Sequence, residues 1–227
     1  SPWADGYARY DQALDDLVRN YGDRVYYEVW NEPDLPEFFG NFSGGTFEKY
    51  LEVFKHVHNK IRSIAPNARI GGPSLSVSFD WVRLRQFMEF CRSESLRCDF
   101  VSLHVWNSDD ELESAAEDLV RVREMFIDNP RYSNTGISKI IVTEYLGNSA
   151  QRMRPGSILA MQRLLEVGRA DGATTSCWYH FGECPSTSSC WDGSLGGLLT
   201  CDATNPRSAW WAHRWYSLGD RKSTRLN

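Results

Sequence analysis

Two glutamates stand where predicted strands end, and they are the residues best placed to do chemistry. Glu32 follows the apolar and aromatic run 25–30, and Glu144 lies near the end of the run 139–145. Pro33 donates no backbone hydrogen bond, so we expect Glu32 to be the last residue before the strand ladder stops. Two carboxyl groups that converge at the ends of strands can cleave a glycosidic bond, one as acid/base and the other as nucleophile.

Runs of strand length alternate with amphipathic helical patterns along the chain. The predicted strands are 25–30, 68–72, 99–106, 139–145 and 173–179, and the predicted helices are 7–21, 47–64, 79–91, 110–126, 156–169 and 207–218. This alternation favours an α/β fold with a parallel sheet. A closed (β/α)8 TIM barrel needs eight strands in about 250 residues. We therefore expect residues 1–219 to be a catalytic domain truncated at its N-terminus, a partial barrel of strands four to eight.

A doubly wound open sheet is the alternative fold. It would bind a nucleotide at a glycine-rich turn between a strand and a helix. The sequence contains neither GxGxxG nor GxxxxGK[ST], and the run Gly71-Gly72-Pro73 is too short for either motif.

The composition argues against two classes of partner. The net charge is −5, and no basic cluster precedes the last few residues, so we expect no nucleic acid. No apolar run approaches the roughly 18 residues of a membrane span, so we expect no membrane segment. Residues 220–227 match the translation of a common sequencing-library adapter, and we expect this tail to stand outside the fold.

The cysteines and one sequon suggest an extracellular protein. The chain has six cysteines, and the spacing of the four between 177 and 201 does not match the CxxC pairs of a zinc site. Disulfides in a secreted protein explain them, with Cys91 and Cys98 as a further candidate pair, and free buried thiols are the alternative. Asn41 begins the only N-glycosylation sequon. We therefore expect a secreted protein.

Several segments resemble one enzyme family. Residues 27–34, which read Tyr-Glu-Val-Trp-Asn-Glu-Pro-Asp, and residues 143–145, which read Thr-Glu-Tyr, resemble the acid/base and nucleophile segments of glycoside hydrolase family 39. This family belongs to clan A of the retaining (β/α)8 glycosidases and includes β-xylosidases and α-L-iduronidases. Residues 71–73 and 100–104 are similar to its fifth and sixth strands, and the resemblance covers most of residues 3–219.

The resemblance implies roles for particular residues. Glu32 would be the acid/base and Glu144 the nucleophile, with their carboxyl groups about 5–5.5 Å apart. Asn31 resembles the asparagine that hydrogen-bonds the sugar 2-hydroxyl. The other implied substrate-binding residues are His104, Trp106, Tyr145 and Trp178. Many clan members have His-x-Tyr on the sixth strand, whereas this chain has His104-Val105-Trp106. This departure weakens the transfer of the family's substrate contacts to this chain, but not that of the two glutamates. The resemblance implies no metal and no cofactor.

Some of these residues could also have purely structural roles. His104 and Trp178 fit core packing as well as sugar binding. Glu28 lies four residues before Glu32, and the period of a strand would place both on the inward face, where Glu28 suits a polar layer. His56 and His58 are two apart on a helix and are expected at the surface.

We expect a retaining glycoside hydrolase that acts on plant or microbial oligosaccharides and polysaccharides and most resembles a β-xylosidase. The alternatives are the same mechanism with α-L-iduronidase, glucanase or mannanase specificity, a non-catalytic carbohydrate-binding barrel, or an interaction scaffold. The sequence does not indicate an oligomeric state. We expect the 227-residue chain on its own to be inactive, because the first three strands of a barrel are missing from it.

Overall fold

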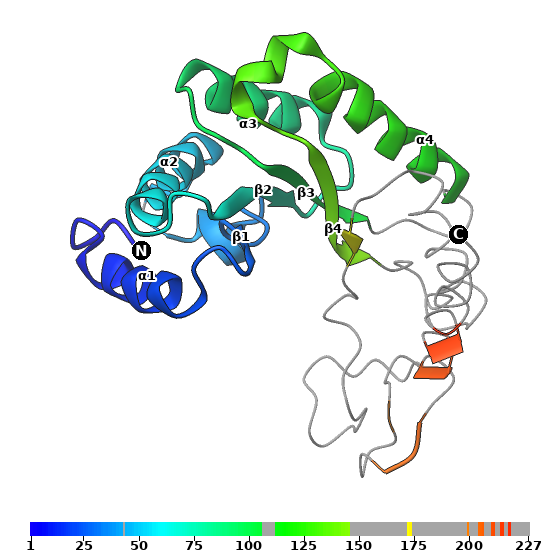
Figure 1. Ribbon diagram of the computed structural model, residues 1–227, viewed down its shortest axis with the longest axis horizontal. Coiled ribbons are helices and arrows are strands. Elements are labelled where there is room, and N and C mark those ends of the chain that lie inside the picture. Colours follow the sequence, from blue (N-terminus) through cyan, green and yellow to red (C-terminus); the bar gives the residue numbers. More distant parts are fainter. Residues whose placement is uncertain are drawn as a thin grey trace. The chain divides into compact units, whose positions relative to one another are not determined.

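The structure is a computed structural model (Figure 1). It describes residues 1–42, 44–105, 112–145, 172–173, 199, 204–206, 210–211, 214–215 and 218. The chain divides into two compact units, residues 1–104 with 121–141, and residues 105–120 with 142–227. In the second unit, Leu199 and Pro206 form an isolated antiparallel bridge, and the rings of Trp210 and Trp211 meet edge to face.

The strands form one sheet whose order follows the sequence, β1-β2-β3-β4-β5. They are β1 Tyr26–Glu28, β2 Arg69–Leu75, β3 Phe100–Val105, β4 Lys139–Tyr145 and β5 Gly172–Ala173. β1 pairs with β2 in parallel, and β2 pairs with β3 in parallel. Sequential order is that of a barrel, whereas a doubly wound sheet reverses its order at a switch point. The α/β fold and its sequential strands are as the sequence predicted.

The main helices lie between these strands. They are α1 Ala8–Tyr21, α2 Phe47–Ile64, α3 Trp81–Ser93 and α4 Leu112–Val122. Thr46 caps α2 by accepting a hydrogen bond from the Lys49 N–H, and the Asp80 carboxylate caps α3 in the same way. None of the helices among the described residues has the length and apolarity needed to cross a membrane. The predicted helix 156–169 and most of the predicted helix 207–218 lie outside the described residues.

Three short helical turns were not predicted from the sequence. They are the π-helical turns η1 Pro36–Gly40 and η3 Arg123–Ile127 and the 3₁₀ turn η4 Pro130–Thr135. Pro36 and Pro130 begin two of them, because the missing N–H of proline costs nothing at a first helical position. The predicted helix 110–126 therefore ends as an α-helix at Val122 and continues as a π turn.

The core lies between the sheet and helices α2 and α3. Tyr50 and Phe54 of α2 and Phe87 of α3 are fully buried, and the Phe54 and Phe87 rings meet edge to face at 4.8 Å. Gly72 of β2 makes room for them, because a Cβ there would lie 2.7 Å from the Tyr50 hydroxyl. That hydroxyl donates a hydrogen bond to the Val29 carbonyl at 3.2 Å. Helix α2 is thereby tied to the backbone that leads from β1 to Glu32.

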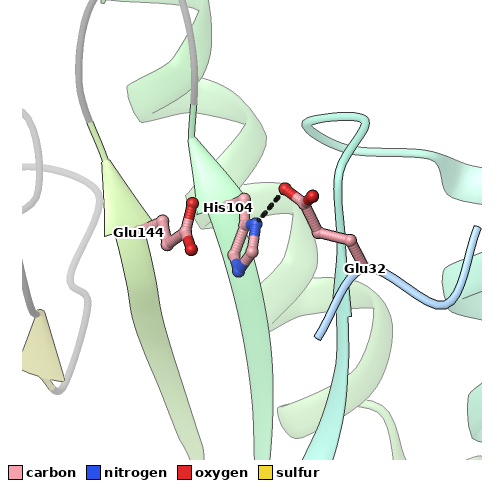
Figure 2. Close-up of side chains that lie close together, drawn as sticks. All are labelled: Glu32, His104 and Glu144. Carbon is pink, nitrogen blue, oxygen red and sulfur yellow. Dashed lines mark hydrogen bonds and ion pairs between the residues drawn. The ribbon is translucent and has the colours of Figure 1, made fainter. Parts of the chain in front are cut away.

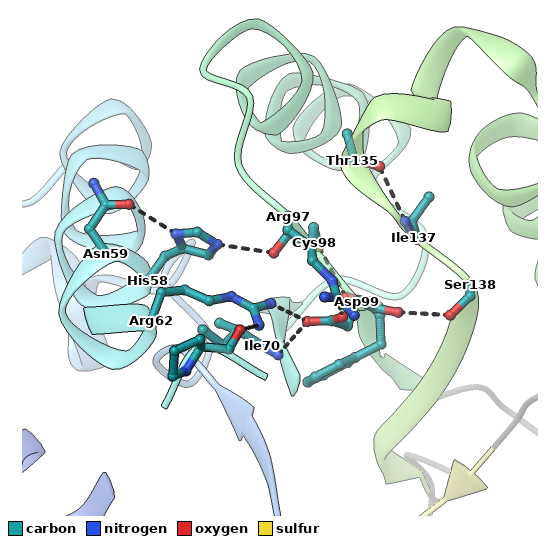
Figure 3. Close-up of polar contacts among 12 residues, drawn as sticks. His58, Asn59, Arg62, Ile70, Arg97, Cys98, Asp99, Thr135, Ile137 and Ser138 are labelled. Atoms are coloured by element: carbon teal, nitrogen blue, oxygen red, sulfur yellow. Dashed lines mark hydrogen bonds and ion pairs between the residues drawn. The ribbon is translucent and has the colours of Figure 1, made fainter. Parts of the chain in front are cut away.

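An ionic network around the buried Asp99 joins the starts of three strands (Figure 3). Asp99, which is 6% exposed, lies immediately before β3. Its carboxylate accepts hydrogen bonds from Arg62 at 2.6 Å and from the Ile70 N–H at 2.9 Å, and it pairs with Arg97 at 2.8 Å. Its carbonyl accepts a hydrogen bond from the Ser138 N–H, immediately before β4. These contacts fix the N-terminal ends of the strands, where barrel residues serve stability.

Two expectations from the sequence are wrong. Cys91 and Cys98 are buried free thiols and not a disulfide, and burial raises the pKa of the Cys91 thiol. His58 is buried and not at the surface, because its ring nitrogens contact the Asn59 side chain and the Arg97 carbonyl. Burial lowers the pKa of His58 and favours the neutral ring. The four cysteines between 177 and 201 lie outside the described residues.

Candidate active site

The backbone that carries Glu32 leaves β1 earlier than the sequence predicted. β1 ends at Glu28, and one further ladder bond runs from the Val29 N–H to the Gly71 carbonyl at 3.1 Å. Trp30 then adopts a left-handed φ of 74°. The turn at Trp30 therefore ends the strand, and the missing N–H of Pro33 does not. The turn also interrupts the strand period, so the expected alignment of Glu28 with Glu32 does not apply.

Glu32 is anchored to β2 by its main chain. It has a φ of 46°, and its N–H donates a hydrogen bond to the Ser74 carbonyl at 2.9 Å. Its own carbonyl accepts from the Leu35 N–H at 3.0 Å. These two bonds close a turn beside the carboxyl end of β2, and they set the direction of the Glu32 side chain.

The side chain of Glu32 is bound to His104 (Figure 2). His104, the next-to-last residue of β3, brings Nδ1 to 2.8 Å from Glu32 Oε1. The His104 side chain is 0% exposed, and that of Glu32 is 12% exposed. The other ring nitrogen, Nε2, lies 2.8 Å from the Ser74 hydroxyl. A carboxyl group in this setting is largely shielded from water and has one oxygen held in place.

His104 was predicted to bind substrate, and that role stays a prediction. Both ring nitrogens are engaged with protein groups, one with Glu32 and the other with Ser74. The histidine is therefore placed to orient Glu32.

Asn31 and Asp34, on either side of Glu32, differ in their contacts. Asn31 is partly exposed, and its side-chain amide has no hydrogen-bond partner among the described residues. It is thus available to a ligand. Asp34, in contrast, accepts hydrogen bonds from the Ser76 hydroxyl at 2.7 Å and from the Ser76 N–H at 2.9 Å. Its carboxylate joins the loop after β1 to the loop after β2.

An aromatic cluster supports this loop. The Trp30 indole N–H donates to the Phe38 carbonyl at 3.3 Å, and its ring meets Phe39 edge to face at 5.1 Å. Phe42 lies 5.9 Å from the Trp30 ring. Trp3, near the start of the chain, contacts Phe39 at 5.3 Å. The turn η1 therefore packs against Trp30, two residues after the end of β1.

Glu144 is the next-to-last residue of β4 and is partly exposed. β4 neighbours β3 in the sheet, and Figure 2 draws Glu144 on β4 and His104 on β3. Tyr145 ends β4, whereas Trp106 and Trp178 lie outside the described residues. The roles of these four residues and the separation of the Glu32 and Glu144 carboxyl groups stay predictions.

Glu28 of β1 has an unsatisfied carboxylate oxygen. Its Oε2 is buried and has no hydrogen-bond partner among the described residues, and the Ser102 hydroxyl of β3 is in the same condition. Buried polar atoms of this kind are uncommon in folded proteins. The sequence predicted Glu28 in a polar layer, and its buried Oε2 has no partner in the part of the chain that the structure describes.

Ser74 is the site residue that sequence reasoning missed. It follows Gly72-Pro73 and belongs to no catalytic motif. Its position next to Glu32 depends on the pairing of β1 with β2 and of β2 with β3, and both are long-range contacts.

Comparisons with known proteins identify the family to which the chain belongs. The model of the glycosyl hydrolases family 39 matches residues 12–127. The β-xylosidase of Caldicellulosiruptor saccharolyticus is 30% identical over 111 residues, which are 45% of this chain and 22% of that protein. The chain thus spans less than a quarter of the length of this curated relative.

Solved structures show the fold. The GH39 enzyme from Xanthomonas axonopodis pv. citri superposes with a TM-score of 0.67 at 21% identity, covering 93% of this chain and 45% of that one. A GH128 endo-β-1,3-glucanase from Amycolatopsis mediterranei, solved with laminarihexaose, gives a TM-score of 0.60 at 19% identity and covers 90% of this chain and 78% of that one. These matches confirm a partial TIM barrel.

Proposed function

Because the chain belongs to family 39 of the glycosyl hydrolases, we propose that it carries the catalytic residues of a retaining glycoside hydrolase. The observation that supports this proposal is the hydrogen bond that holds Oε1 of the nearly buried Glu32 on His104. The second carboxylate oxygen, Oε2, has no partner among the described residues, so it is available to a glycosidic oxygen.

The proposed reaction is a double displacement. Glu32 donates a proton to the leaving oxygen while the ionised Glu144 attacks the anomeric carbon and forms a glycosyl-enzyme. Glu32, now ionised, removes a proton from water, and the water releases the sugar with its original configuration. Asn31, whose amide is unpaired among the described residues, would bind the 2-hydroxyl. Bonds to that hydroxyl strengthen in the transition state.

The substrate we propose is a β-xyloside in plant or microbial polysaccharide. The support is the curated relative at 30% identity, which is a β-xylosidase. The same two glutamates also serve α-L-iduronidase, glucanase or mannanase specificity, and these are the alternatives. A panel of aryl glycosides distinguishes them. Fastest hydrolysis of the β-xyloside is expected, and a faster rate on another sugar would reassign the specificity.

The proposed role of Glu32 as the acid is tested by comparing substrates with poor and good leaving groups. In the full-length protein, Glu32→Gln should lower kcat/KM for a phenyl glycoside by about 10²–10⁴-fold, because general acid catalysis contributes roughly that factor. Hydrolysis of a dinitrophenyl glycoside should fall far less, since that leaving group needs no proton. The exposed Glu37→Gln, five residues away, is the matched control. Equal losses for both substrates would assign Glu32 another role.

The nucleophile is tested by trapping. An activated 2-fluoro-glycoside should add one glycosyl group to the wild-type protein, and peptide mass spectrometry should find it on Glu144. Glu144→Gln should show no adduct. A label on another residue would move the nucleophile, and a product of inverted configuration by NMR would refute double displacement.

We also propose that the protein acts outside the cell. Asn41 of the sequon is exposed, and an N-linked glycan requires such a position. Recovery of the full-length protein from the medium of its native host would support this location. Recovery only inside the cells would contradict it.

A further inference from the structure

Ser74 is linked to Glu32 in two ways. Its backbone carbonyl binds the Glu32 N–H directly, and its hydroxyl binds His104, which in turn binds the Glu32 carboxyl group. The Ser74 carbonyl accepts a hydrogen bond from the Glu32 N–H at 2.9 Å, and its hydroxyl lies 2.8 Å from His104 Nε2. We infer that Ser74 is a positioning residue that fixes the proton on His104 and so selects the Glu32 oxygen that donates. The inference rests on the proposed acid/base role of Glu32.

The backbone of Ser74 favours glycine, yet a serine is present. Its φ is 54°, in the left-handed region that residues with a side chain rarely adopt. The register between β2 and β3 shifts between Pro73 and Leu75, so Ser74 stands out of the regular pairing. Irregularities of this kind re-aim side chains beside active sites. Since glycine would satisfy the backbone with less strain, the hydroxyl is the part of Ser74 that calls for a function.

The direction of the hydrogen bond between the Ser74 hydroxyl and His104 Nε2 goes with the tautomer of His104. A neutral imidazole has one N–H donor and one acceptor nitrogen. When the Ser74 hydroxyl donates to Nε2, the proton lies on Nδ1, and the Nδ1–H donates to Glu32 Oε1. This bond is satisfied both when Glu32 is ionised and when it carries a proton on Oε2. Because Oε1 accepts the hydrogen bond from His104, the acid proton of Glu32 is carried on Oε2. Oε2 is then the oxygen that donates to the leaving group.

Loss of the hydroxyl removes this preference. The imidazole proton then also occupies Nε2, and Nδ1 becomes an acceptor that competes for the proton of Glu32. The step that needs an acid slows, whereas attack by the nucleophile on a good leaving group does not depend on that proton. Loss of the Ser74 hydroxyl should therefore lower the rate more for a poor leaving group than for a good one, as loss of the Glu32 carboxyl group does.

The experiment measures kcat/KM on phenyl and dinitrophenyl glycosides for Ser74→Gly and Ser74→Ala in the full-length protein. We expect about a tenfold loss on the phenyl substrate, roughly the value of one hydrogen bond, and less than about twofold on the other. In the Glu32→Gln background, Ser74→Gly should cause no additional loss. Ser102→Ala is the matched control, because Ser102 is a fully buried serine on β3 whose hydroxyl has no partner among the described residues. It should leave the ratio of the two rates unchanged.

A second readout does not depend on activity. The ¹⁵N chemical shifts of His104 should place the proton on Nδ1 in the wild type and on both nitrogens in Ser74→Gly. Unchanged tautomers, or equal losses on both substrates, would overturn the inference while leaving Glu32 as the acid. If the wild type hydrolyses neither substrate, the proposed function fails, and the inference fails with it.

Discussion

Three residues around the site hold left-handed backbone conformations. They are Trp30, Glu32 and Ser74, with φ values of 74°, 46° and 54°. Each costs roughly 1–2 kcal/mol in a residue with a side chain. The surrounding contacts must offset this cost, and the bond between the Glu32 N–H and the Ser74 carbonyl joins two of the three. Strain of this kind gathers at functional sites, because there the side chain must take one direction.

Glycine at position 71 allows β2 and β3 to approach. A Cβ there would lie 2.3 Å from the Phe100 carbonyl oxygen and 2.7 Å from the Phe100 ring. The backbone oxygen belongs to the neighbouring strand and has no freedom to move away. We predict that Gly71→Ala lowers the free energy of unfolding of the full-length protein by about 3 kcal/mol, as overpacking does. Urea denaturation measures this difference.

Gly40→Ala is the control for this substitution. Its nearest neighbour would be the Pro36 Cβ at 3.5 Å, an ordinary van der Waals contact. It should change the free energy of unfolding by less than about 1 kcal/mol. Equal effects at positions 40 and 71 would show that the approach of β2 and β3 has no special cost.

At the scale of elements, a charged cluster fastens the turn η4 to helix α3. Glu89 of α3 accepts hydrogen bonds from Arg131 at 2.6 and 2.9 Å and from the Tyr132 hydroxyl at 2.7 Å. These contacts, with Arg131 first, lower the pKa of Glu89 from 4.5 to about 2. η4 leads into β4, so this cluster helps to set the path of the strand that carries Glu144.

The depressed pKa predicts a pH-dependent contribution to stability. It is fully present above the ordinary pKa of 4.5 and is lost as the pH falls toward the folded-state value of about 2. Glu89→Gln should lower the free energy of unfolding at pH 7 by about 1 kcal/mol, because the pairs are partly exposed. The difference from wild type should shrink below pH 4 in urea titrations. Glu52→Gln, which breaks an exposed pair with Lys49, is the control, and a pH-independent difference for Glu89→Gln would contradict the prediction.

At the scale of the whole molecule, β1 lies at the edge of the sheet order. Tyr26 on this strand is 40% exposed, and the Arg69 guanidinium lies over its ring at 4.4 Å. A closed barrel has no edge strand, whereas an open edge offers unpaired N–H and C=O groups to other chains. The chain also spans 45% of the GH39 enzyme to which it is similar.

We predict that the 227 residues expressed alone aggregate or form a molten state, and do not hydrolyse aryl xylosides. The unpaired oxygen of Glu28 gives a second reason, because a buried carboxylate without a partner is costly. Size-exclusion chromatography, near-UV circular dichroism and a xyloside assay test this. A monomer that melts cooperatively and turns over substrate would show that the sheet needs no further strands.

The sequence by itself determined the order and type of the main elements. Helix α2 has the predicted bounds 47–64, because its apolar residues recur at the helical period and Thr46 and Pro66 flank it. The strands around 26, 69, 100 and 139 were found because buried parallel strands are continuous apolar runs. Glu32 was proposed as the acid/base from local sequence alone, since Asn-Glu-Pro after an aromatic residue is a contiguous signal, and that role stays a prediction.

The tertiary structure decided how Glu32 is held. Glu32 is hydrogen-bonded to His104, 72 positions away, and to Ser74, 42 positions away. No period or motif reports such contacts, because they depend on strand register and on a backbone conformation that local propensity disfavours. The burial of His58 and the free thiols of Cys91 and Cys98 were decided in the same way. Local patterns therefore fix which elements form, and packing between distant strands fixes which side chains meet.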